Sequence, residues 1–202
     1  MTLLCDLGVM YGVDKAPAVF HSYTPEYHRI LSGIRGTTRL IVEIGIGYPE
    51  LMAPIVGNSY RPGASLRMWR DYFPNTHIVG CDIKKELLFE DERISCEYVD
   101  QSDMISLMKL KWALSQKCDS ADLIVDDGSH EPEHMIGTMN ILWPFVRTGG
   151  YYIIEDIKEK DLPFFERLHR HLKFSDCDLI YSHKGKNSWD SFVCFRKKYY
   201  GL

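Results

Sequence analysis

Two groups of acidic residues are the part of this sequence best suited to chemistry. The first is Asp126-Asp127, followed closely by His130, and the second is Glu155-Asp156. Carboxylates are the oxygen ligands that Mg²⁺ prefers, and an imidazole is the commonest general base near neutral pH. The residue types therefore predict a divalent cation next to a proton acceptor, provided that the fold brings the two groups together.

The residues before each acidic group indicate how they meet. Residues 123–125 and 152–154 are apolar, β-favouring runs, and a helical pattern over 131–145 lies between them. Such a βαβ unit has parallel strands, whose carboxyl ends lie at one edge of the sheet, where open α/β sheets bind ligands. Asp127 is expected to face this site, whereas Asp126 would point to the opposite face and serve the structure.

Asp127, Glu155 and Asp156 form the predicted metal site. Three carboxylates in close contact repel one another and raise one another's pKa, and a bound Mg²⁺ removes that cost. His130 lies three residues beyond Asp127, at the start of the next helix, where it could reach a substrate hydroxyl. We interpret His130 as a general base and His134, one turn further on, as a surface or capping residue.

Three other predicted strands also end in glycine or polar residues; these strands are 40–44, 77–81 and 94–99. Gly45 and Gly47 follow the first and would let the backbone approach a ligand closely. Asp82 follows the second and is placed to accept hydrogen bonds from a ribose. Asp100-Gln101-Ser102 follows the third and is placed at an adenine edge. Their recurrence predicts a nucleoside-like ligand.

The remaining pattern describes one doubly wound α/β domain with no internal repeat or linker. Five strands alternate with helices, and an antiparallel pair over 179–181 and 191–195 closes the sheet. The other predicted helices are 24–34, with Thr24 as its cap, 64–70, 102–116, with Ser102 as its cap, and 161–172. Residues 48–63, with three prolines, are expected to form a long functional loop.

Composition narrows the class of protein. The formal net charge of −4 and the dispersed basic residues argue against a nucleic-acid partner. The six cysteines show no CxxC or zinc-ligand spacing, which is typical of a reduced, cytoplasmic protein. No apolar run approaches the length that crosses a membrane, and the start does not match a signal peptide.

These motifs, taken in order, resemble the class I S-adenosylmethionine-dependent methyltransferases, and within them the macrocin O-methyltransferase-like group that modifies sugar hydroxyls. The resembling segments cover nearly the whole chain and are 11–15 with the following His21, Tyr23 and Tyr27, and 43–47, 63–69, 80–82, 100–103, 126–130 and 154–156. The resemblance implies a Rossmann-like methyltransferase domain over 39–202, with a mostly parallel seven-stranded sheet and a C-terminal antiparallel hairpin. Residues 1–38 would form a lead-in and a helix that cover the cofactor site.

The resemblance also assigns roles to single residues. Together with the strand-end positions, it gives S-adenosylmethionine the following contacts: Glu43, Gly45, Gly47, Ser65, Asp82, Asp100, Gln101 and Ser102. The family's Mg²⁺ ligands map onto Asp127, Glu155 and Asp156, and its proposed base maps onto His130. Asp127 and His130 would then carry the catalytic step.

The expected activity is Mg²⁺-dependent methyl transfer to a hydroxyl of a sugar or glycosylated small molecule. The acceptor pocket would include the N-terminal segment, residues 48–62, the stretch after Asp156 and residues 184–189, and pairing in this family suggests a homodimer. Two alternatives stay open: a catechol-type O-methyltransferase, which needs a base less because a phenol is more acidic, and a hydroxylase-like, non-catalytic relative that binds cofactor and metal. A nucleoside-binding or partner-binding module would leave the acidic residues unexplained.

Overall fold

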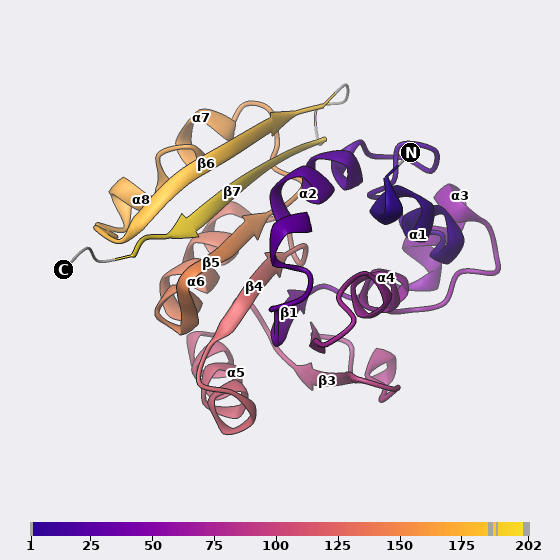
Figure 1. Ribbon diagram of the computed structural model, residues 1–202, viewed down its shortest axis with the longest axis horizontal. Coiled ribbons are helices and arrows are strands. Elements are labelled where there is room, and N and C mark those ends of the chain that lie inside the picture. The colour runs from indigo at the N-terminus through magenta and orange to yellow at the C-terminus, as the bar shows by residue number, and fades with distance from the viewer. Residues whose placement is uncertain (1, 186–187, 189, 200–202) are drawn as a thin grey trace.

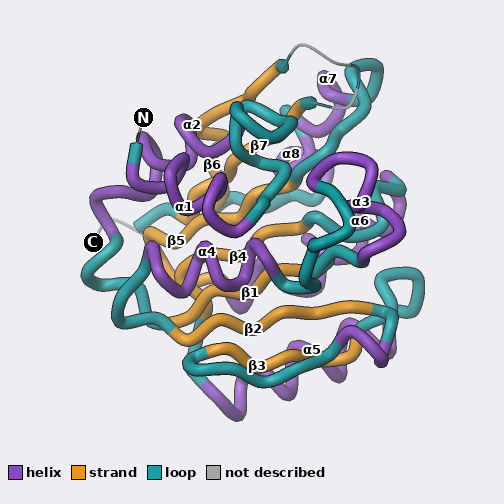
Figure 2. The backbone as a smooth tube through the Cα atoms, turned by 90° about the vertical axis from the view of Figure 1, so that its right-hand side faces the viewer, coloured by secondary structure: helices purple, strands orange, loops and turns teal. Residues whose placement is uncertain are grey.

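Seven strands form a single sheet in the order β3-β2-β1-β4-β5-β7-β6 (Figures 1 and 2). The computed structural model describes residues 2–185, 188 and 190–199. The strands are β1 Leu40–Ile44, β2 His77–Asp82, β3 Ile94–Tyr98, β4 Ala121–Asp126, β5 Val146–Ile154, β6 Cys177–Lys184 and β7 Ser191–Lys197. Strands β1 to β5 pair in parallel, and β7 runs antiparallel to both β5 and β6. The predicted fold class is confirmed.

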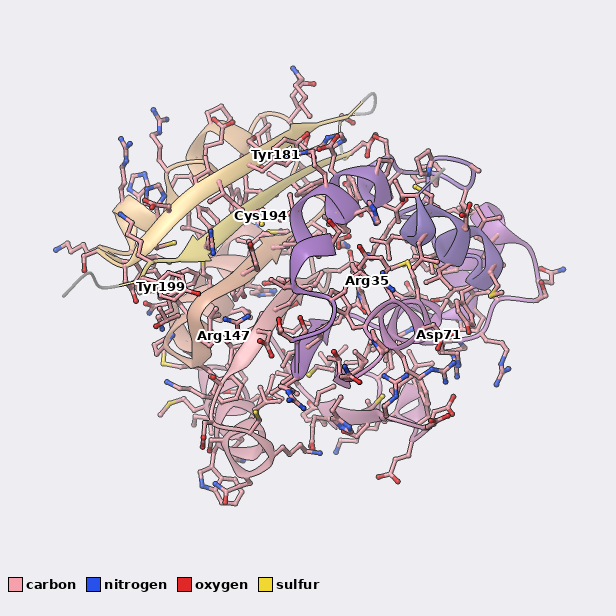
Figure 3. All side chains as sticks on the ribbon, viewed as in Figure 1. Arg35, Asp71, Arg147, Tyr181, Cys194 and Tyr199 are labelled. Carbon is pink, nitrogen blue, oxygen red and sulfur yellow. The ribbon has the colours of Figure 1, made fainter. Side chains whose placement is uncertain are left out.

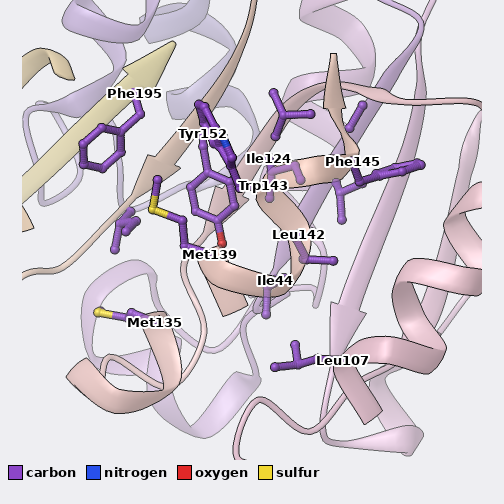
Figure 4. Packing of buried hydrophobic residues seen from close by; sticks show 14 of the residues in the cluster. Ile44, Leu107, Ile124, Met135, Met139, Leu142, Trp143, Phe145, Tyr152 and Phe195 are labelled. Atoms are coloured by element: carbon purple, nitrogen blue, oxygen red, sulfur yellow. The ribbon is translucent and has the colours of Figure 1, made fainter. Parts of the chain in front are cut away.

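Helices cover both faces of the sheet (Figure 1). The helices are α1 Leu3–Tyr11, α2 Tyr23–Leu31, α3 Pro49–Val56, α4 Ala64–Tyr72, α5 Met104–Lys117, α6 Pro132–Leu142, α7 Leu162–Phe165 and α8 Leu168–His171, with 3₁₀ turns at Ser32–Ile34, Lys85–Leu87 and Trp143–Phe145. Helices α5 to α8 pack on one face around a large apolar core (Figure 4). Helices α1, α2 and α4 pack on the other face. Among the described residues, no helix is long and apolar enough to cross a membrane.

The alternation of side chains along the strands decides which face each functional residue joins. Ile41, Leu123 and Ile153 pack with α1, α2 and α4, while Ile124 and Tyr152 pack with α5 to α8. Backbone pairing continues past the strand ends, because the amide of residue 127 donates to the carbonyl of 44, and that of 155 to the carbonyl of 126, both at 2.9 Å. Odd-numbered residues 43, 127 and 155 therefore fall on the face of the N-terminal helices.

The segment 48–63 is not the long loop that the sequence predicts, because it contains helix α3. Its three prolines favoured a loop, but Pro49 occupies the first turn of the helix, where its missing N–H costs nothing. Pro54 lies within the helix and helps to keep it short, and Gly57 ends it. The prediction of irregular structure was wrong for about half of this segment.

Helix boundaries also differ from the predicted ones at several caps. Helix α1 falls in the predicted lead-in, and Thr2 caps it by accepting from the Cys5 amide. Helix α2 begins one residue before Thr24, and α5 is capped by Asp103, which accepts from the Ile105 amide at 2.9 Å, rather than by Ser102. Neighbouring Ser, Thr and Asp residues compete for the cap, so single-residue assignments fail easily.

The C-terminal part closes against the N-terminal helices. The predicted helix 161–172 is broken into α7 and α8. Tyr181 of β6 lies beside the N-terminal helices (Figure 3), where the Arg29 guanidinium lies 4.5 Å from the centre of its ring. The predicted hairpin of β6 and β7 is present, with longer strands than expected. Of the predicted hairpin loop and acceptor segment, Lys186, Asn187 and Trp189 lie outside the described residues.

Candidate active site

A cavity of about 320 Å³ opens at the carboxyl ends of the parallel strands. Most residues that the sequence assigns to the site line it: Gly45, Gly47, Ser65, Asp82, Asp100, Gln101, Ser102, Asp127, His130 and Asp156. Two predicted residues, Glu43 and Glu155, are fully buried and lie behind the cavity wall instead. The edge of the sheet thus gathers both predicted halves of the site, the nucleoside-like half and the acidic half.

The glycine loop allows two chain segments to touch at the cavity wall. Gly45 has φ +88°, and a Cβ at this position would collide with the carbonyl oxygen of Asp127. A Cβ on Gly128 would likewise collide with the side-chain oxygen of Gln101. A larger residue at Gly45 would push the β1 loop and the β4 loop apart, and one at Gly128 would displace the Gln101 side chain.

Glu43 and Ser65 form the buried floor behind the glycine loop. Ser65 Oγ donates to Glu43 Oε2 at 2.8 Å. Burial raises the pKa of Glu43 to about 7, although the charge of Lys15 opposes this shift. Because Ser65 lines the cavity and Glu43 does not, a direct cofactor contact is better supported for Ser65, and the contact of Glu43 stays a prediction.

Asp82 is held by the backbone in a position suited to a ligand. Its Oδ2 accepts from the Ile46 amide at 3.1 Å and its Oδ1 accepts from the Lys84 amide at 2.8 Å. A carboxylate has about four lone-pair sites, so acceptor capacity remains for ribose hydroxyls. Asp100 accepts from both the backbone amide and the hydroxyl of Ser102, which shapes this part of the rim.

Gln101 supports the site from within the protein. Its Nε2 donates to Asp126 Oδ1 at 2.8 Å and to Thr138 Oγ1 at 3.1 Å, and its Oε1 accepts from the Ser129 amide at 2.8 Å. Burial raises the pKa of Asp126 to about 7, with the Gln101 hydrogen bond acting in the opposite direction. The structural role predicted for Asp126 is confirmed, and Gln101 ties β4, α6 and the 127–130 turn together.

Replacing Gln101 with alanine is expected to lower the free energy of unfolding by about 2–3 kcal/mol, because Asp126 and the Ser129 amide lose their partner. Urea unfolding followed by circular dichroism measures this change. Ser102→Ala is the matched control. The exposed hydroxyl of Ser102 donates only to Asp100 among the described contacts, so the free energy of unfolding is expected to change by no more than about 0.5 kcal/mol. Equal losses in both variants would contradict the bridging role of Gln101.

Asp127, His130 and Asp156 come together on the acidic side of the cavity. One ligand atom from each of the three lies within 4.8 Å of the other two. His130 and Asp156 are both in left-handed conformations, with φ +55° and +52°, which are uncommon outside glycine and cluster at functional sites. These two turns direct the side chains of His130 and Asp156 into the cavity, whereas a continuing strand or helix would direct them elsewhere.

Glu155 approaches this group from behind and is bound to a lysine. Lys15 Nζ lies 2.6 Å from Glu155 Oε2 and 2.5 Å from Asp127 Oδ2. Burial raises the pKa of Glu155, while the charge of Lys15 opposes the shift. For Lys15, burial acts to lower its pKa, but the charges of Asp127 and Glu155 prevail and raise it.

Asp156 is held by residues of the N-terminal segment. Tyr23 donates its hydroxyl proton to Asp156 Oδ1 at 2.8 Å, and His21 Nε2 lies 3.7 Å from the same oxygen. The other nitrogen of His21, Nδ1, lies 3.1 Å from Asp190 Oδ1. Burial and, next, the charge of Asp127 raise the pKa of Asp156. The N-terminal segment is therefore part of the site wall.

The donor set fits a hard divalent cation. His130 Nδ1 is buried and has no hydrogen-bond partner within the described part of the chain, and the same holds for Glu155 Oε1. Buried polar atoms are nearly always paired, so the unpaired His130 Nδ1 beside a cluster of carboxylates points to a missing ligand, whereas the buried Tyr27 hydroxyl is a donor close to Glu155. The compact group contains Asp127 and Asp156 of the predicted metal set together with His130, and Glu155 lies outside it, so the role of Glu155 as a metal ligand stays a prediction.

Sequence reasoning gave no individual role in the site to Lys15, Tyr23, Tyr60 or His134. Lys15 and Tyr60 line the cavity, Tyr23 holds Asp156, and His134, interpreted as a surface residue, also lines the cavity and contacts Ser129. A signal existed for two of them, since Lys15 and Tyr23 belong to the N-terminal motif that carries the family resemblance. Nothing in the local pattern shows that Tyr60 donates to the Ile46 carbonyl over the glycine loop.

Several curated O-methyltransferases have similar sequences, although no family model matches the chain. The chain is 33% identical over 164 residues to the 8-demethyl-8-alpha-L-rhamnosyl tetracenomycin-C 2'-O-methyltransferase of Streptomyces olivaceus, covering 81% of this chain and 40% of that protein. It is 36% identical over 140 residues to the demethylmacrocin O-methyltransferase of Streptomyces fradiae, covering 68% and 32%. The chain spans less than half the length of these curated relatives.

A solved structure shows the same fold. The MycE methyltransferase from the mycinamycin biosynthetic pathway, in complex with Mg, SAH and mycinamycin VI, aligns with a TM-score of 0.74 at 24% identity, over 98% of this chain and 55% of that chain. The two chains therefore share their fold. The sequence relatives are O-methyltransferases of the macrocin O-methyltransferase type, and the chain is homologous to part of them, which confirms the resemblance found in the sequence.

Proposed function

We propose that this chain is an S-adenosylmethionine- and Mg²⁺-dependent O-methyltransferase that acts on a hydroxyl of a sugar or glycosylated small molecule. The observation that carries the proposal is that the glycine loop and Asp82 line the same cavity as the group of Asp127, His130 and Asp156. The names of the relatives, which specify hydroxyls of glycosylated products, and the Mg and SAH of the MycE complex support it.

The nucleoside half of the cavity suits the cofactor. Asp82 would accept hydrogen bonds from the ribose, while Gly45 and Gly47 let the backbone approach the methionine end closely. Ser65, with Glu43 behind it, forms the floor there. When bound, S-adenosylmethionine supplies a sulfonium methyl group with a good leaving group.

On the acidic half, the chain's own residues must orient the acceptor and take its proton. Asp127, Glu155 and Asp156 would hold Mg²⁺, which makes a bound hydroxyl more acidic when present. His130 would accept the hydroxyl proton, since an aliphatic hydroxyl does not ionise near neutral pH by itself. The walls of the cavity would align the acceptor oxygen for in-line displacement.

Isothermal titration calorimetry with S-adenosylhomocysteine, with and without Mg²⁺, tests the cofactor assignment. We expect one-site binding of S-adenosylhomocysteine and a separate binding heat for Mg²⁺. Mass spectrometry after incubation with S-adenosylmethionine and either rhamnosides or catechols then identifies the acceptor class. Absence of S-adenosylhomocysteine binding would contradict the proposal, and methylation of catechols alone would favour the small-phenol alternative.

A cytoplasmic location and a homodimer are proposed with this function. The six cysteines are free, which supports a reducing compartment. Light scattering coupled to size-exclusion chromatography measures the mass in solution and decides between a monomer and a dimer.

A further inference from the structure

Lys15 lies among the acidic side chains although no step of the proposed reaction uses it. It follows α1 in the chain and is 1% exposed. Its ammonium contacts Asp127 Oδ2 and Glu155 Oε2 and lies 4.0 Å from Glu43 Oε1. A single buried cation thus joins the N-terminal segment to the ends of β1, β4 and β5.

The contacts of Lys15 leave part of each carboxylate available. Lys15 binds one oxygen of Glu155, and the other, Oε1, is buried without a hydrogen-bond partner among the described residues. Lys15 binds Asp127 through Oδ2, and Asp127 still belongs to the group that can hold an ion. The ammonium therefore fixes one oxygen of each carboxylate and makes no contact with the second oxygen of either.

We propose that Lys15 is a positioning residue for the divalent cation, which holds Asp127 and Glu155 so that they present oxygen atoms to it. The inference rests on the proposed function, because it presupposes a cation at this site. Groups that hydrogen-bond metal ligands from outside typically contribute 10–100-fold to metal affinity. The positive charge of Lys15 opposes a cation, but the carboxyl groups of Asp127, Glu155 and Asp156 outnumber it on this side of the cavity.

The test measures Mg²⁺ and S-adenosylhomocysteine binding to Lys15→Met by calorimetry. We expect Mg²⁺ affinity to fall by about 10–100-fold and S-adenosylhomocysteine affinity to stay within about threefold. Lys84→Met is the matched control, because Lys84 also lines the cavity but its ammonium lies over the Tyr48 ring at 3.4 Å. Its Mg²⁺ affinity is expected to stay within about twofold of the wild type.

A second comparison covers the case in which Lys15→Met fails to fold because Glu155 is left buried and unpaired. The double variant Lys15→Met/Glu155→Gln removes both charges, and Glu155→Gln alone is its reference. We expect the double variant to bind Mg²⁺ more weakly than the reference, because Asp127 also loses its donor. Mg²⁺ affinity that is unchanged or higher after Lys15 is replaced would overturn the inference, as would equal losses of both ligands. A wild-type protein that binds no Mg²⁺ would refute the cation site of the proposed function instead.

Discussion

Asp127→Asn is expected to lower kcat/KM for methyl transfer by about a thousandfold or more, because the cation loses a charged ligand. The cation itself would supply several kcal/mol of transition-state stabilisation. Asparagine has nearly the same shape, so the turn at 127–130 and its contact with Gly45 should persist. Affinity for S-adenosylhomocysteine is therefore expected to stay within about threefold of the wild type. Product formation from S-adenosylmethionine and calorimetry measure the two quantities.

Asp82→Asn is the reciprocal control on the nucleoside half of the same cavity. It should weaken S-adenosylhomocysteine binding by about tenfold, since a charged hydrogen-bond acceptor is lost, and leave Mg²⁺ affinity within about twofold.

Retained turnover in Asp127→Asn would exclude a metal-binding role for Asp127. If each variant lost both ligands equally, the assignment of separate cofactor and cation halves would be wrong.

The strands and their functional ends were predictable because parallel strands buried on both faces appear in the sequence as short continuous apolar runs. The runs 40–44, 77–81 and 123–125 are apolar and β-branched, and each observed strand contains its predicted run. Alternation also separates Asp126 from Asp127 correctly: the first is buried against Gln101 and the second reaches the cavity. Parallel pairing then collects these strand ends at one edge, whatever the loops between them do.

Contacts between distant segments were not predictable in this way. The Lys15 ammonium meets Glu155 across 140 residues, and Tyr23 meets Asp156 across 133. No local period encodes such a pair, since it depends on where α1 and α2 pack on the sheet. Glu155 illustrates the consequence: its position was predicted, but its burial behind the cavity and its bond to Lys15 were not.

The proton transfer in the proposed reaction predicts that His130→Asn loses activity but keeps both ligands. Asparagine tolerates the left-handed backbone at this position, φ +55°, so the turn should be retained. If His130 accepts the acceptor's proton, kcat should fall by about 10²–10⁴-fold with a sugar hydroxyl. Mg²⁺ and S-adenosylhomocysteine affinities should both stay within about threefold, which calorimetry measures on the same preparation.

That pattern separates the two roles which the group of Asp127, His130 and Asp156 permits. A metal-ligating His130 would lower Mg²⁺ affinity in His130→Asn, because one donor of the group disappears. His134→Asn is the neighbouring control, since His134 lines the same cavity but its Nδ1 lies 3.0 Å from Ser129 Oγ; a loss in kcat below about tenfold is expected. A near-normal rate in His130→Asn would exclude His130 as the general base. It would favour a phenolic acceptor, because the pKa of a phenol is lower than that of a sugar hydroxyl and a base is less necessary.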